Sequence, residues 1–156
     1  QSAYKDVKST DPTHPVMIRM NGWFFYDFED NFFREGNPFG NETADIVMVN
    51  AYSNVEDYYE DFVATVSSRA ISSLLSIDPD TRIIIALGSW KEPPLWYLPT
   101  EENITSEINY LKQQDSLIGI GFFKYGARGS EWYLPDPAEG APEIWSIIKE
   151  NKPGSI

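Results

Sequence analysis

The sequence predicts an α/β domain with a parallel sheet, and three observations support this fold class. Four short runs are almost continuously apolar instead of alternating, which favours strands buried on both faces, as in a parallel sheet. Stretches with helical spacing of apolar residues separate the later runs, as in strand–helix repeats with right-handed crossovers. The length of 156 residues suits one domain that can bury a core. The four runs are residues 16–20, 46–49, 83–87 and 118–123.

The first part of the chain is expected to be less regular than the rest. Residues 1–14 are polar and end in two X-Pro pairs, so we expect an extended lead-in, followed by a single α/β domain over residues 15–156. The connection over residues 21–45 is not plainly helical. It contains the turn sequence NPFG at 37–40, and residues 28–34 are compatible with a short helix.

Three later segments are expected to be helices. Residues 55–77 carry apolar side chains at steps of three and four, and the sequence DPD at 78–80 ends the pattern. A second helix is expected to begin at Thr100, because threonine caps free amides and the two acids that follow suit the positive end of the helix dipole. A third helix is expected to begin near Pro142 and to stop before the sequence KPG at 152–154.

Composition excludes several functional classes. The chain has 24 acidic and 12 basic residues, a formal charge of −12, and no cluster of basic residues, so we expect neither a nucleic-acid partner nor an anionic membrane surface. The absence of cysteine excludes disulfides and thiolate chemistry, and a lone His14 disfavours a histidine-based metal site or a Ser-His-Asp triad. We therefore predict no cofactor and no metal, and carboxylates, hydroxyls and amides remain for chemistry.

Two further features suggest an extracellular protein. The triplets that begin at Asn41 and Asn103 are acceptor sequons for glycosylation and lie in polar stretches. No apolar run approaches the roughly 20 residues of a membrane span. The chain opens with Gln1 rather than Met, so we expect a processed N-terminus and a secreted or extracellular location.

Several segments resemble the closing half of a TIM-barrel glycoside hydrolase. The sequence ADIVMVNAY at 44–52 is similar to a strand that occurs late in many of these barrels. Residues 82–90, the helix start LPTEE at 98–102 and the strand LIGIGFFKY at 117–125 resemble the last units. The resemblance covers residues 15–150 and implies the last four strand–helix units, because a complete barrel needs roughly 250 residues. The chain would then be either a fragment of a longer protein or a half-barrel completed by a partner or a second copy.

The loops at the carboxyl ends of the four runs each combine aromatic rings with carboxylates. Such loops form the functional face of parallel α/β folds. A sugar offers an apolar face that packs on an aromatic ring and hydroxyls that bond to carboxylates and amides, so this combination predicts a carbohydrate ligand. The candidate ligand-binding residues are Trp23, Asn50, Tyr52, Trp90, Tyr125 and Trp132.

Glycoside hydrolysis would need a pair of these carboxylates on either side of one bond. Retention requires a separation of about 5–5.5 Å and inversion about 6.5–9.5 Å. The candidates are Glu92 as general acid, with Asp27 or Glu56 as its partner. Many retaining enzymes place a catalytic glutamate directly after a late strand, whereas Glu92 lies several residues beyond the third run.

Two noncatalytic interpretations stand beside the enzyme. A binding module would keep the aromatic face and lack the paired carboxylates. A structural or assembly subunit would use the flanks of the unclosed sheet, because two open edges and an apolar face need cover. Self-association, or a complementary chain over the open sheet, is expected under each interpretation.

Overall fold

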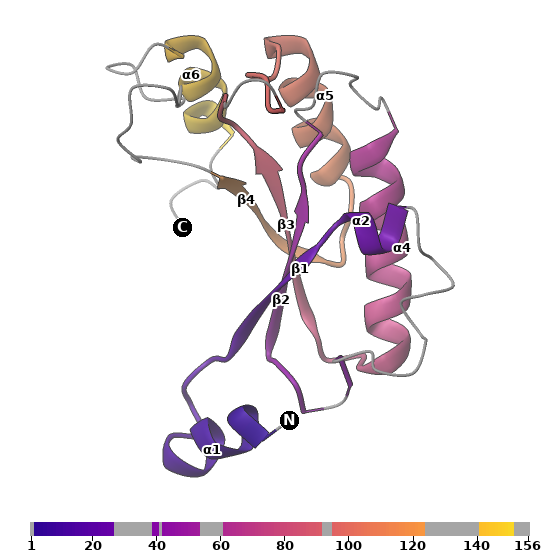
Figure 1. The fold of residues 1–156 in the computed structure, drawn as a ribbon, viewed down its shortest axis with the longest axis vertical. Helices are drawn as coiled ribbons and strands as arrows, with labels where there is room; N and C mark the ends of the chain where they lie inside the picture. The colour runs from indigo at the N-terminus through magenta and orange to yellow at the C-terminus, as the bar shows by residue number, and fades with distance from the viewer. Residues whose placement is uncertain are drawn as a thin grey trace.

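The sheet has four parallel strands in chain order, as the sequence predicts. A computed structural model describes residues 2–26, 39–40, 42–53, 61–91, 95–123 and 141–151. The strands are β1 (Met17–Asn21), β2 (Ile46–Ala51), β3 (Arg82–Gly88) and β4 (Leu117–Phe123), and their order across the sheet is β1-β2-β3-β4. Each strand hydrogen-bonds in parallel to the next one along the chain (Figure 1). This architecture is an α/β fold with the layout of half a TIM barrel.

The three described helices after residue 60 lie at the predicted places, whereas the two described helices before residue 27 are not predicted by the sequence. The helices are α1 (Ser2–Thr10), α2 (Trp23–Tyr26), α4 (Phe62–Ile77), α5 (Glu101–Leu111) and α6 (Pro142–Glu150). Thr100 caps α5 as predicted, since its Oγ1 accepts the Asn103 N–H at 3.1 Å. The helix α4 ends at Asp78, as predicted. Residues 28–34, 55–60 and 152–154, for which sequence predictions were made, lie outside the described residues.

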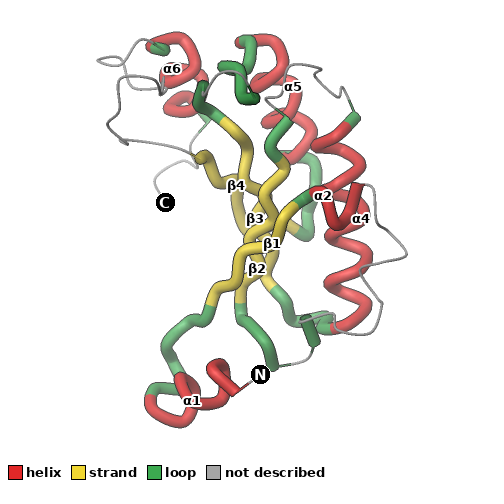
Figure 2. Tube along the Cα trace, viewed as in Figure 1, coloured by secondary structure: helices red, strands yellow, loops and turns green. Residues whose placement is uncertain are grey.

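The core fills the space between one face of the sheet and the helices. Figure 2 shows α4 and α5 standing on the same side of the strands. Alternate residues of β2 and β3 are buried there, because successive side chains of a strand point to opposite faces. The helices contribute apolar residues three or four positions apart. The core includes Val47, Val49, Ala51, Ile83, Ile85, Leu87, Phe62, Val66, Ala70, Leu74, Ile104, Ile108 and Leu111.

The opposite face is buried less than the sequence predicts. The central strand β3 is buried along most of its length, but alternate side chains of β1 and β2 are exposed or only half-buried. We call this surface the open face, formed by Met17, Arg19, Asn21, Ile46, Met48 and Asn50. A continuous apolar run shows that both faces of a strand suit burial. It does not show that a second layer is present to bury them.

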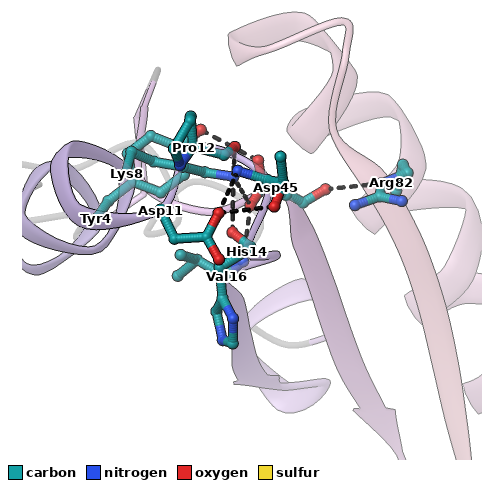
Figure 3. Close-up of polar contacts among 9 residues, drawn as sticks. Tyr4, Lys8, Asp11, Pro12, His14, Val16, Asp45 and Arg82 are labelled. Atoms are coloured by element: carbon teal, nitrogen blue, oxygen red, sulfur yellow. Dashed lines mark hydrogen bonds and ion pairs between the residues drawn. The ribbon is translucent and has the colours of Figure 1, made fainter.

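The predicted extended lead-in is wrong over residues 2–10, which form helix α1. The reason is a tertiary contact that the polar sequence of this segment does not predict. Tyr4 and Lys8 lie one helical turn apart, and both reach Asp45, the residue before β2 (Figure 3). His14 is exposed, as expected, although its carbonyl accepts a hydrogen bond from Lys8 Nζ at 2.8 Å.

Asp45 joins α1 to the beginnings of three strands. Its carboxylate accepts hydrogen bonds from Val16 N–H at 2.7 Å and Tyr4 OH at 3.1 Å, and its Oδ2 lies 2.8 Å from Lys8 Nζ. Its backbone N–H donates to Val16 O at 2.9 Å, and its carbonyl accepts the Arg82 N–H at 3.2 Å. Burial alone would raise the pKa of Asp45, but the bonds from Lys8, Val16 and Tyr4 outweigh burial and hold it below its ordinary value.

The substitution Asp45→Asn is expected to lower the free energy of unfolding by about 1–3 kcal/mol at neutral pH, because charge-assisted hydrogen bonds are lost. A lowered pKa in the folded state means that this contribution is complete above about pH 4, the ordinary value for aspartate. It is lost as the pH falls through the folded-state pKa. Urea unfolding at neutral and acidic pH measures both effects. Equal losses for Asp45→Asn and for Asp115→Asn, which changes an exposed turn, would contradict this role.

Candidate functional site

A pocket lies where β1 and β2 end, at the carboxyl edge of the sheet. Its volume is about 520 Å³. Among the described residues it is lined by two tryptophans, two amides, one phenol, one guanidinium and two further apolar side chains. The lining residues are Arg19, Met20, Asn21, Trp23, Phe24, Asn50, Tyr52 and Trp96. Functional sites of parallel α/β folds occupy this edge, so the pocket is the candidate site.

The strand register brings the polar lining together. Asn21 pairs with Asn50, and Arg19 pairs with Met48 two residues earlier. Side chains two apart on a strand share a face, so Arg19 and Asn21 stand on the same face as Asn50. The sheet therefore places the amides of Asn21 and Asn50 side by side, and the guanidinium of Arg19 lies two residues earlier on the same face.

Trp23 is held at one side of the pocket by the short helix α2. Its N–H donates to Asn21 Oδ1 at 3.1 Å, a local bond that starts the turn out of β1. Its ring centroid lies 4.6 Å from that of Phe62 on α4 and 5.6 Å from that of Tyr26. Arg69 of α4 donates to Tyr26 O at 2.6 Å and so fixes the end of α2. The Trp23 ring is thus supported from behind by the core.

A second aromatic group stands on the other side of the pocket. The ring centroids of Tyr52 and Trp90 lie 5.0 Å apart, edge to face, and those of Tyr52 and Phe123 lie 5.6 Å apart, stacked. Trp96 packs on Trp90 with centroids 5.0 Å apart. Edge-to-face and stacked pairs add stability beyond simple burial. These four rings, from the ends of β2, β3 and β4 and the loops that follow, form one aromatic cluster, of which Tyr52 and Trp96 line the pocket.

Two polar atoms of the lining are buried without a partner. Asn50 Oδ1 and the Tyr52 hydroxyl make no hydrogen bond within the described part of the structure. A buried polar atom left unsatisfied costs about 1–3 kcal/mol, so native structures seldom retain one. Ser89, directly before the buried Trp90, has a third such atom in its Oγ. The carboxyl edge of the sheet therefore holds hydrogen-bonding capacity that the described protein leaves unused.

The Tyr52 hydroxyl keeps its proton at neutral pH. Burial raises its pKa above the ordinary value of 10.0, and the positive charge of Arg19 offsets only part of that rise. A protonated phenol can both donate and accept a hydrogen bond, whereas Asn50 Oδ1 can only accept.

Close approach of backbone at this edge requires a glycine. The Gly22 N–H donates to Asn50 O at 2.9 Å, which extends the β1–β2 pairing beyond the last residue of β1. A Cβ on Gly22 would lie 2.4 Å from that oxygen and 3.1 Å from Val66 Cγ1. Gly22 therefore lets α2 turn away while Asn50 keeps its place in the pocket.

The structure gathers three of the predicted ligand-binding residues and separates a fourth. Trp23, Asn50 and Tyr52 line the pocket. Trp90 is only 3% exposed and packs against Tyr52 and Trp96, so it supports the lining rather than forming it. The predicted site residues outside the described parts are Asp27, Glu56, Glu92, Tyr125, Trp132 and the sequon residue Asn41. The other sequon residue, Asn103, lies in the first turn of α5.

Sequence reasoning did not select Arg19 or Trp96 as binding residues. Arg19 interrupts an otherwise apolar strand, and this interruption, two residues before Asn21, is the signal that could have identified it. Trp96 lies in a proline-rich loop that the sequence alone does not place. Glu107 was also missed: it is buried on α5 and accepts a hydrogen bond from Ser53 Oγ, which ties the loop after β2 to that helix.

No group of three potential metal-binding side chains occurs among the residues described. In the same parts of the chain, none of the helices has the length and apolar character needed to cross a membrane. No known protein family matches the chain, and comparison with curated proteins finds no match.

The substitution Gly22→Ala is expected to lower the free energy of unfolding by about 1–3 kcal/mol, because the new methyl group overlaps Asn50 O. Gly119→Ala on β4 is the matched control, since no atom lies within 4 Å of its added Cβ. Thermal and urea unfolding of both variants measure the difference. An equal effect of the two substitutions would show that the close approach at Gly22 is unimportant.

Proposed function

We propose that the protein is a carbohydrate-active protein that binds a sugar in the pocket at the ends of β1 and β2. The observation that carries this proposal is the pairing of unsatisfied polar atoms with tryptophan rings. Asn50 Oδ1 and the Tyr52 hydroxyl lack partners within the described residues, and Trp23 and Trp96 line the same pocket. A sugar that reached the pocket floor would supply hydroxyls to these atoms and apolar C–H faces to the rings.

The site chemistry favours a polar ligand with an apolar face over a purely apolar one. A hydrophobic ligand would leave both buried atoms unsatisfied, and the cost of that state persists in the complex. A sugar hydroxyl can donate to Asn50 Oδ1, and the protonated Tyr52 hydroxyl can donate to a sugar oxygen in return. A pocket of about 520 Å³ also falls within the range of small-molecule sites.

Glycoside hydrolysis is the proposed reaction, with Glu92 as general acid and Asp27 or Glu56 as its partner. The resemblance to the closing half of a TIM-barrel glycoside hydrolase and the location of the pocket support this proposal. Glycan binding without catalysis is the alternative. We further propose a secreted protein with glycan attached at Asn41 and Asn103, on the strength of the two sequons.

The substitution Tyr52→Phe is expected to weaken sugar binding about tenfold, the effect of one lost hydrogen bond in a desolvated site. The same change is expected to leave the free energy of unfolding unchanged or raised, because the hydroxyl has no partner within the described residues. Calorimetric titration with oligosaccharides found by a glycan array, together with urea unfolding, measures both quantities. Loss of stability without loss of affinity would show that the hydroxyl is structural.

Five further variants separate binding from catalysis. Trp96→Ala is expected to abolish binding, whereas Trp145→Ala on α6, outside the pocket lining, is expected to leave it intact. A hydrolysis screen of Glu92→Gln, Asp27→Asn and Glu56→Gln then tests the enzyme. Activity unchanged in all three would remove these assignments, and binding without any hydrolysis would favour the noncatalytic module.

Assembly is a second proposed role, favoured by apolar side chains on the uncovered parts of the sheet. Met17 on β1 and Ile118 on β4 are each 52% exposed, and these strands are the two edges of the described sheet. Unpaired edges and exposed apolar side chains favour association. A second copy or a complementary chain over the open face is therefore expected, and light scattering across a dilution series tests it. A monomer at every concentration would count against self-association.

A further inference from the structure

Arg19 is the charged side chain among the described residues that line the pocket, and its surroundings set it apart from two other arginines. Arg69 donates to Phe25 O at 3.1 Å, and Arg82 Nε lies 3.4 Å from Asp45 O. Both therefore have structural partners. The ion pairs of the described residues join Lys5 to Glu42 and Lys8 to Asp45, and Arg19 belongs to neither. Arg19 is exposed, and within the described parts of the structure its guanidinium has neither a hydrogen bond nor an ion pair, so it is available to a ligand.

The position of Arg19 suits contact with a ligand that occupies the pocket. It stands on the open face in the same strand as Asn21, two residues earlier. Arg19 and Tyr52 line the same pocket. A guanidinium carries five N–H donors in a planar fork that matches the paired oxygens of a carboxylate or a sulfate.

We propose that the pocket selects a glycan that carries one acidic substituent, a carboxylate or a sulfate ester, which Arg19 binds. Asn50 and Tyr52 then hold neighbouring hydroxyls, and the tryptophans hold the ring. This inference rests on the proposed sugar-binding function and adds the substrate class to it.

The overall charge of the protein limits the ligand to a sparsely charged glycan. At a formal charge of −12 the protein repels a dense polyanion as a whole. At physiological salt, charges more than about 8 Å from a ligand are largely screened. The affinity for a single acidic group therefore depends mainly on the guanidinium beside it. Accordingly, the described lining of the pocket combines one cationic group with neutral amides, a phenol and aromatic rings.

The test is calorimetric titration of the full chain with three matched trisaccharides. One is a neutral glucose trisaccharide, the second has a terminal glucuronate in the same linkage, and the third has a 6-sulfate on the terminal sugar. Either acidic probe, or both, is expected to bind at least about tenfold tighter than the neutral one, the effect of one charge-assisted hydrogen bond. The advantage is expected to shrink as salt is raised.

Three variants identify the group responsible. Arg19→Gln is expected to abolish the preference, so that acidic and neutral probes bind with equal affinity, since the charged fork is removed. Arg19→Lys is expected to retain only part of the preference, because an ammonium lacks the fork. Lys149→Gln on α6 removes the same charge from an exposed position away from the pocket lining, and it is expected to bind as the wild type does. Circular dichroism confirms that each variant is folded.

The outcomes distinguish this inference from the function on which it rests. Equal affinity for acidic and neutral probes, or an acidic preference that survives Arg19→Gln, overturns the role of Arg19 and leaves sugar binding standing. Absence of binding by all three probes overturns both. Tighter binding of the glucuronate probe identifies the substituent as a carboxylate, and tighter binding of the sulfated probe identifies a sulfate ester.

Discussion

The rest of this structure depends on burial of one face of a parallel sheet beneath α4 and α5. Alternate residues of β2 and β3 are buried against the helices, and this packing fixes the register between the strands. Because the register is fixed, every side chain on the opposite face also has a fixed place. Hydrophobic burial on the covered face therefore positions the polar groups of the open face, where packing does not hold them directly.

The two ends of the sheet differ in how the polar groups of β1 and β2 are satisfied. At the amino end, the carboxylate of Asp45 is bonded to Tyr4, Lys8 and Val16, so its burial is compensated and the contact stabilises the fold. At the carboxyl end, Asn50 Oδ1 and the Tyr52 hydroxyl are buried without partners within the described chain. Unsatisfied groups survive in native structures chiefly where function needs them. Among the described residues Thr81 Oγ1, beside the amino end of β3, also lacks a partner. Asn50 and Tyr52 differ from Thr81 because they line one pocket, which points to the carboxyl end as the site of ligand binding.

The regular elements could be predicted because their signals are local. Continuous apolar runs gave β1 to β4, helical spacing gave α4, and the cap at Thr100 gave the start of α5. The helix α1 was missed because Tyr4 and Lys8 are stabilised by Asp45, a residue distant in the sequence. Arg19 and Trp96 were missed for a related reason. Placing Arg19 in the pocket requires the strand register, and placing Trp96 there requires the path of a loop.

The sequence by itself determined the fold class, the order of the four strands and of the helices α4, α5 and α6, and the kinds of side chain at the carboxyl edge. It could do so because backbone preference and hydrophobic periodicity act over a few residues. Only the tertiary structure decided that Trp23, Asn50 and Tyr52 share one pocket, that Trp90 is buried against Tyr52, and that Arg19 lines the same pocket. Those relations depend on pairing between strands and on packing between loops, which join residues that are far apart along the chain.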